Sequence, residues 1–144
     1  MADTTHKGYT AAIASALTTE LNSLATAANT AASSAIDNTS TLDLFMDLEL
    51  VIATMGTTRS AGARVEVYIV RAVDGTNYDD VHQETADLIA VFPLDAAVTA
   101  RRQSRVDIPI APGMFKLFAR NVTGQTLAAS GNTLKARYHS VKTV

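Results

Sequence analysis

The chain has 144 residues, of which 47% are hydrophobic, and its formal net charge at pH 7 is −2. This length is sufficient for one domain with a buried core and is short for two, and the weak negative charge provides no net attraction to a phosphate backbone or an anionic membrane. The absence of cysteine excludes disulfide bridges, thiolate nucleophiles and thiolate zinc sites. We therefore expect one domain whose partners are neither nucleic acids nor membranes.

The first part of the chain differs in composition from the rest, since residues 1–41 contain few charges and are rich in Ala, Thr, Ser and Asn. A helix from about Thr10 to Ala28 would place four apolar residues on one stripe, namely Ile13, Leu17, Leu21 and Leu24. The Thr and Ser content lowers helix propensity, so this helix would be marginal in isolation. We predict an N-terminal arm over residues 1–33, helical or extended, which packs on the edge of its own domain or docks on a neighbouring subunit.

A period of two replaces the helical spacing after this arm. From Leu42 to Ile52 the even positions are apolar, while the odd positions include Asp43, Asp47 and Glu49, which is typical of a half-buried strand. Turn sequences separate further predicted strands over residues 63–70, 89–94, 104–110, 114–122 and 133–141. Strands in this number without helices between them indicate an antiparallel β-sandwich or jelly roll over residues 34–144.

No pattern of residues points to catalysis or to a metal. No metal-ligand spacing connects the three histidines, which are His6, His82 and His139. The carboxylates of Asp43, Asp47 and Glu49 are better explained by a solvated strand face than by a cation site or a catalytic pair. The sequence also lacks a Gly-x-Ser-x-Gly nucleophile motif and a Gly-x-x-x-x-Gly-Lys phosphate loop. We therefore expect no catalytic residues, no cofactor, no metal and no enzymatic activity.

The densest basic cluster consists of Arg101, Arg102 and Arg105, at the start of a predicted strand. Guanidinium groups of this kind can pair with carboxylates on a protein partner. An ordinary solvated loop and strand edge is the favoured interpretation, because no aromatic residues are interleaved with the arginines.

Several short segments, taken in order along the chain, resemble small structural proteins of tailed-bacteriophage particles. They are Arg64–Val70, Asp74–Tyr78, Val91–Asp95, Ile108–Gly113, Phe115–Leu117 and Ser130–Leu134. Among such proteins the chain most resembles the head decoration, or cement, proteins of short-tailed phages. The resemblance spans roughly residues 34–138 and lies in the order and character of the segments.

This resemblance implies a structural virion protein on the outer surface of the capsid, made in the host cytoplasm. Its partner would be the major capsid protein, whose neighbouring subunits it would clamp as a homo-oligomer, a dimer or a trimer. On this hypothesis the apolar contacts would be Ile13, Leu17, Leu21 and Leu24. The candidate polar contacts would be Arg101, Arg102 and Arg105.

An alternative function is a receptor- or carbohydrate-binding module, for example from a tail fibre, because sandwiches commonly present ligand-binding loops at one end. Sugar-binding platforms usually require exposed aromatic rings, and the chain has no Trp. A small platform could be formed by the four tyrosines, Tyr9, Tyr68, Tyr78 and Tyr138.

Overall fold

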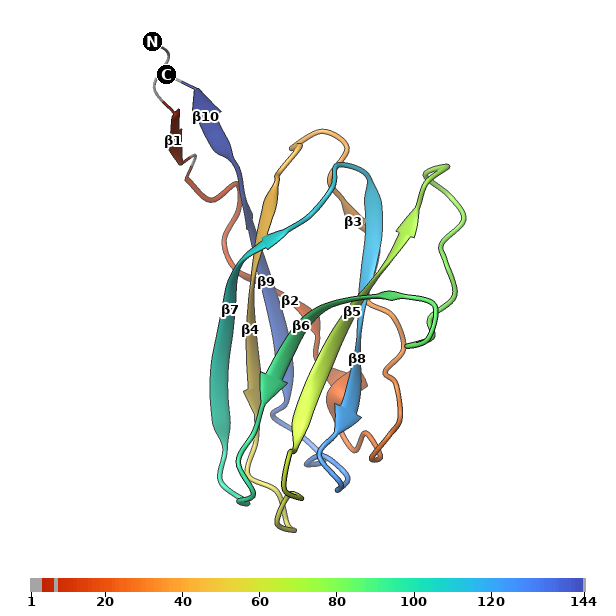
Figure 1. Cartoon of the computed structure of the whole chain (residues 1–144), viewed down its shortest axis with the longest axis vertical. Helices are drawn as coiled ribbons and strands as arrows, with labels where there is room; N and C mark the ends of the chain where they lie inside the picture. The colour runs from red at the N-terminus through yellow and green to blue at the C-terminus, as the bar shows by residue number, and fades with distance from the viewer. Residues whose placement is uncertain (1–3, 7, 144) are drawn as a thin grey trace.

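Two four-stranded antiparallel sheets packed face to face form the body of the molecule in the computed structural model, which describes residues 4–6 and 8–143 (Figure 1). A short 3-10 helix, η1, covers Thr19–Leu21, and the strands are β1 Thr4–His6, β2 Ala14–Leu17, β3 Ile36–Asp37, β4 Phe45–Ile52, β5 Arg64–Ala72, β6 Asp87–Pro93, β7 Arg101–Pro109, β8 Met114–Val122, β9 Thr133–His139 and β10 Val141–Thr143. The described residues contain no α-helix, and hence no helix that could cross a membrane.

The strands pair in a nested order, the first with the last. β1 pairs with β10, β2 with β9, β3 with β8, β4 with β7 and β5 with β6, all antiparallel. This long ribbon of paired strands is rolled up so that β4 also pairs with β9 and β5 with β8. Sheet I has the order β2-β9-β4-β7 and sheet II the order β3-β8-β5-β6. This arrangement is a jelly roll, and it confirms the predicted antiparallel β-sandwich.

The alternation predicted from Leu42 to Ile52 is confirmed within β4, whose residues are alternately buried and partly exposed. It does not extend to Leu42 and Leu44, which lie before β4 and are 52% and 38% exposed. The inward-facing residues are at most 1% exposed, namely Met46, Leu48, Leu50 and Ile52. They meet the inward-facing residues of sheet II, among them Val65, Val67 and Leu117, in one core cluster. Each fully buried side chain of this size contributes roughly 1.5–3 kcal/mol, so this core is the main source of stability in a chain without disulfides.

The outer side of sheet II carries a second, smaller apolar cluster. Tyr68 and Val70 of β5 and Phe118 of β8 are buried there, and Tyr78 and Ala86 of the β5–β6 loop pack against them. The rings of Tyr68 and Phe118 stack with their centroids 5.0 Å apart. The β5–β6 loop therefore closes this part of sheet II, whereas the outer face of sheet I carries partly exposed side chains.

The helix predicted from about Thr10 to Ala28 is wrong. Residues Ala14–Leu17 are an extended strand, β2, which pairs with β9 and is followed by the short η1. Leu17 and Leu21 are fully buried in the core between the sheets. Because Ser and Thr lower the helix propensity of this segment, pairing with β9 and burial of the two leucines decide its conformation.

The stretch between η1 and β3 is tied to β8 by reciprocal hydrogen bonds. The amides of Thr30 and Ser33 donate to the carbonyls of Ala119 and Leu117, at 2.8 and 2.7 Å. The hydroxyls of Thr30 and Ser33 accept from the amides of the same two residues at 3.0 Å. Leu17, Leu21, Thr30 and Ser33 are buried, so the N-terminal segment contributes side chains to the interior of the sandwich.

Replacing Leu17 by Ala is expected to lower the free energy of unfolding by about 2–5 kcal/mol, because the leucine is fully buried. Ile13, which is 44% exposed just before β2, is the matched control, and Ile13→Ala should change stability by less than about 0.5 kcal/mol. Urea denaturation followed by circular dichroism measures both values. Equally small effects would show that this segment lies outside the core.

Candidate functional site

The candidate site lies on the outer face of sheet I, where β9, β4 and β7 are neighbours. The register of β4 and β9 sets Asp47 opposite Arg137 and Phe45 opposite His139. Residues two apart on a strand face the same side, so these four side chains share the outer face. Asp47 and His139 are therefore diagonal neighbours across the pair of strands, within reach of each other.

A β-bulge brings Asp107 to the same place. The register of β4 with β7 shifts between Met46 and Leu48, so β7 has one extra residue opposite Asp47. Asp107 adopts the left-handed conformation, with φ of 55°, and its amide donates a hydrogen bond to Asp47 Oδ1 at 3.0 Å. The Asp47 carboxylate therefore stabilises the bulge, and the bulge in turn places the Asp107 carboxylate beside it.

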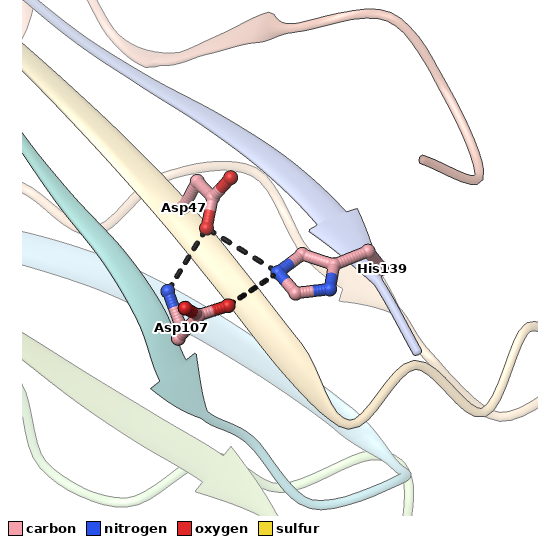
Figure 2. A group of neighbouring side chains, drawn as sticks. All are labelled: Asp47, Asp107 and His139. Atoms are coloured by element: carbon pink, nitrogen blue, oxygen red, sulfur yellow. Dashed lines mark hydrogen bonds and ion pairs between the residues drawn. The ribbon is translucent and has the colours of Figure 1, made fainter. Parts of the chain in front are cut away.

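Asp47, Asp107 and His139 converge in a cluster that Figure 2 shows, one residue from each of three adjacent strands. His139 Nε2 lies 3.4 Å from Asp47 Oδ1 and 3.2 Å from Asp107 Oδ1. One nitrogen or oxygen atom from each residue lies within 4.8 Å of the others, so a single cation could contact all three. The side chains of His139 and Asp47 are 9% and 13% exposed and that of Asp107 is 63% exposed, so the cluster opens to solvent at Asp107.

Two aromatic rings hold the imidazole in place. The ring of Phe45 stacks on His139 with centroids 5.4 Å apart, and the ring of Tyr9 meets it edge-on, also at 5.4 Å. The Tyr9 hydroxyl donates to Asp47 Oδ2 at 2.8 Å, and the guanidinium carbon of Arg137 lies 3.2 Å from the centroid of the Tyr9 ring. Packing and hydrogen bonds therefore fix both the imidazole and the Asp47 carboxylate.

These contacts also set the ionisation of Asp47. Burial raises the pKa of this carboxyl, but hydrogen bonds from the Asp107 amide and the Tyr9 hydroxyl, with the charge and hydrogen bond of His139, outweigh burial and lower the pKa below its ordinary value. Asp47 is therefore a carboxylate at neutral pH, able only to accept hydrogen bonds or to bind a cation.

A groove with a volume of about 180 Å³ runs beside this cluster, and we call it the sheet I groove. It is lined by Tyr9, Ile13, Asp47, Leu48, Glu49, Ser104, Val106 and Arg137. Ile13 and Val106 are 44% and 63% exposed, so apolar side chains stand at the surface next to charges of both signs. Aromatic and arginine side chains are enriched at surfaces that contact another protein, and Tyr9 and Arg137 supply one of each in this groove.

Of the four apolar residues predicted as docking contacts, only Ile13 lines the sheet I groove. Leu17 and Leu21 are fully buried, and Leu24 is partly buried against the same core. The single docking stripe predicted from a helical spacing is therefore not formed, because the segment is not helical and its leucines turn into the sandwich.

Two of the three predicted arginines point in different directions. Arg105 Nε donates to the carbonyl of Val91 at 2.9 Å and its guanidinium lies over the ring of Phe92, so this side chain connects β7 to β6. Arg102 has a side chain that is 69% exposed and lies 3.9 Å from Glu49. Arg102 is therefore available to a partner, whereas Arg105 stabilises the contact between β7 and β6.

The third arginine, Arg101, belongs to a structural ion-pair network. Asp95 accepts from Arg101 and from Arg59, whose side chain is fully buried and lies 2.8 Å from the Asp95 carboxylate. Arg59 also donates to the carbonyl of Thr99 at 3.1 Å, which holds the β6–β7 loop against the β4–β5 loop. The hydrogen bonds from Arg101 and then Arg59 lower the pKa of Asp95 to about 2.

The four tyrosines do not form one aromatic platform. Tyr68 of β5 is 5% exposed, and Tyr78 of the β5–β6 loop packs against the same small cluster on the outer side of sheet II. Burial, followed by the charge of Asp43, raises the pKa of Tyr138 to about 12. Tyr9, 48% exposed, is the one of the four that lines the sheet I groove.

The sequence pattern correctly assigns Asp47 and Glu49 to an outer strand face, but Asp43 lies before β4 and is buried, accepting a hydrogen bond from Thr10 at 2.6 Å. The meeting of Asp47 with Asp107 and His139 was missed. The alternation of apolar and polar residues predicts the two strands that contain Asp47 and His139. Only the register of these two strands and the bulge in β7 bring the three side chains together.

No family model and no curated protein matches this chain. Among solved structures it is similar to a glycoside hydrolase family 43 arabinoxylan arabinofuranohydrolase from Bacillus subtilis in complex with cellotetraose (TM-score 0.37, 16% identity, 85% of this chain and 20% of that one). It is also similar to the K1 cleaved adhesin domain of Lys-gingipain from Porphyromonas gingivalis (TM-score 0.38, 14% identity, 77% and 60%). A third is CBM32-1 from a family 31 glycoside hydrolase from Clostridium perfringens (TM-score 0.31, 15% identity, 96% and 94%). The chain spans less than two thirds of the length of the first two, and likenesses of this degree carry no argument about function.

Replacing Asp95 by Asn should destabilise the protein at neutral pH, because buried Arg59 then loses its counter-charge. The Asp95 pKa of about 2 lies below the ordinary value of about 3.9. The stabilising contribution is therefore complete above about pH 4 and is lost as the pH falls towards 2. Urea denaturation should show that the wild type has a larger free energy of unfolding than Asp95→Asn at pH 7, and that this difference disappears near pH 2. A difference that is independent of pH would contradict this role of Asp95.

Proposed function

We propose that this chain is a structural virion protein that binds the outside of a tailed-phage capsid and stabilises contacts between major capsid protein subunits, without catalysis. The observation that carries the proposal is the sheet I groove, where Ile13 and Val106 are exposed beside the charged side chains of Glu49 and Arg137. A protein partner can bury the two aliphatic side chains in this groove and pair with the charges around them.

The resemblance to phage head decoration proteins supports the same function. Its segments fall on strands and turns of the sandwich, for example Arg64–Val70 within β5 and Phe115–Leu117 within β8. Double-sheet jelly rolls occur in viral capsid proteins but also in lectins, so the fold is compatible with the proposal without deciding it.

The ribbon formed by β1 and β10 offers a second contact element. It projects beyond the sandwich at one end (Figure 1). β10 follows β9, which carries His139, so the ribbon begins next to the cluster of Asp47, Asp107 and His139. On this proposal the groove and the ribbon together reach across a junction between two capsid subunits.

Binding of this kind stabilises an assembled capsid by mass action. A protein that contacts two subunits at once binds the assembled state more tightly than the separated one, and so opposes their separation. Association of the chain into a dimer or trimer would multiply weak individual contacts through effective concentration. On this proposal the partner is the major capsid protein, and the site of action is the outer surface of the virion.

Tyr9 favours a second candidate, a receptor- or carbohydrate-binding module of a tail fibre. Its half-exposed ring lines the groove beside Asp47 and Glu49, whose carboxylates can accept hydrogen bonds from sugar hydroxyls. The guanidinium of Arg137 lies over the Tyr9 ring, so less of the ring surface is free to stack on a sugar. Binding of the purified chain to a glycan array would favour this candidate over capsid binding.

The test is co-sedimentation of the purified full chain with phage heads assembled without it. The wild type should bind saturably, and the double substitution Ile13→Glu and Val106→Glu should weaken binding at least about tenfold, because two carboxylates would replace apolar contacts. The matched control is Val73→Glu, at a position that is 96% exposed beyond the end of β5 in the other sheet; it should bind like the wild type.

Absence of saturable binding by the wild type would overturn capsid binding, and an equal loss in the Val73→Glu protein would overturn the assignment to the groove. Deleting residues 1–33 is unsuitable as a test, because it removes Leu17 and Leu21 from the core. Substitutions at exposed positions leave that core intact.

A further inference from the structure

We propose that Asp47, Asp107 and His139 bind a divalent metal ion of the zinc class on the outer face of sheet I. Imidazole and carboxylate groups are ordinary zinc ligands, and here they come from three adjacent strands of one sheet. The inference does not depend on capsid binding, because it concerns a site within one chain.

Two carboxylates share one nitrogen in this cluster. Asp47 Oδ1 and Asp107 Oδ1 both face His139 Nε2, at 3.4 and 3.2 Å (Figure 2). Nε2 carries at most one hydrogen, so it can donate fully to only one of the two oxygens. Charge-assisted N–H···O bonds are also shorter than these distances, about 2.7–2.9 Å. A cation between the three atoms would instead bind lone pairs from all of them at once.

The distances from the imidazole nitrogen to the two carboxylate oxygens suit zinc. Nitrogen and oxygen ligands lie about 2.0–2.2 Å from a tetrahedral zinc ion, which sets them about 3.3–3.6 Å from one another. The distances of His139 Nε2 from the two carboxylate oxygens, 3.4 and 3.2 Å, are close to this range. Calcium requires six to eight oxygen ligands at about 2.3–2.6 Å and is a poor match for a set that contains a nitrogen.

The ligands are held in position before any ion binds. Phe45 and Tyr9 orient the imidazole, and Asp47 accepts one hydrogen bond on each oxygen, from the Asp107 amide and from the Tyr9 hydroxyl. Outer contacts of this kind raise metal affinity by fixing ligand orientation. The exposed Asp107 side chain leaves one side of the site open, so that water or a group from another molecule can take the fourth position.

The substitution that tests the site is Asp107→Asn. Asn tolerates the left-handed backbone that Asp107 adopts, and the side chain is mostly exposed, so the fold should be retained. The matched control is Glu49→Gln, which removes one carboxylate from the same face of β4 outside the cluster. A second control is His82→Gln, because His82 lies 4.0 Å from Glu84 on a loop and could bind zinc at the surface.

Calorimetric titration of the metal-free full chain with zinc chloride near neutral pH should show one ion bound per chain. Glu49→Gln and His82→Gln should bind equally well, and Asp107→Asn at least about tenfold more weakly, as expected when a ligand is lost. Cobalt(II) in place of zinc should give the intense visible absorption of tetrahedral coordination. Lack of zinc binding by the wild type, unchanged binding by Asp107→Asn, or loss on His82→Gln would each overturn the proposal.

Discussion

The antiparallel register between β4 and β9 is the constraint on which the outer face of sheet I depends. It sets Phe45 opposite His139 and Asp47 opposite Arg137, although these residues are about ninety positions apart in the chain. A slip of one residue would turn the buried leucines of β4 outward and the polar residues inward. The same burial that stabilises the core therefore also fixes which polar groups meet on the surface.

The edges of both sheets explain why the N-terminal segment is part of the sandwich. β2 covers the edge of β9, and the stretch before and including β3 covers the edge of β8 with backbone hydrogen bonds. At the opposite edges, Arg105 and Gln103 of β7 donate to the carbonyls of Val91 and Pro93 in β6. Unpaired edge groups promote aggregation, so these contacts limit unspecific pairing between copies of the chain.

Much of the sandwich could be predicted from alternation of apolar and polar residues. The strand Met114–Val122 has the predicted bounds, and the inward face of β4 consists of the predicted even-numbered residues. The N-terminal segment was misassigned because Leu17 and Leu21 are spaced as on a helix, while their burial comes from a short strand and a single 3-10 turn. Local spacing alone could not distinguish these two cases.

The cluster of Asp47, Asp107 and His139 could not be predicted because it depends on long-range features. Its geometry requires the β4–β9 register and one extra residue in β7. The residues next to His139 in sequence show no metal-ligand spacing that would predict the cluster. The structural roles of Arg101 and Arg105 could not be predicted for the same reason, since their partners lie on other elements. Sequence alone shows that such residues are polar, and the fold decides whether they face a partner or stabilise the chain.

On the proposed function, the outer face of sheet I contacts the capsid. Electron cryomicroscopy of phage heads saturated with the purified chain tests this contact most directly. We expect density for the jelly roll on the outside of the shell, over junctions between major capsid protein subunits, with the outer face of sheet I and the β1–β10 ribbon turned towards the shell. Absence of density on the shell, or a bound chain with sheet II against the capsid, would contradict it.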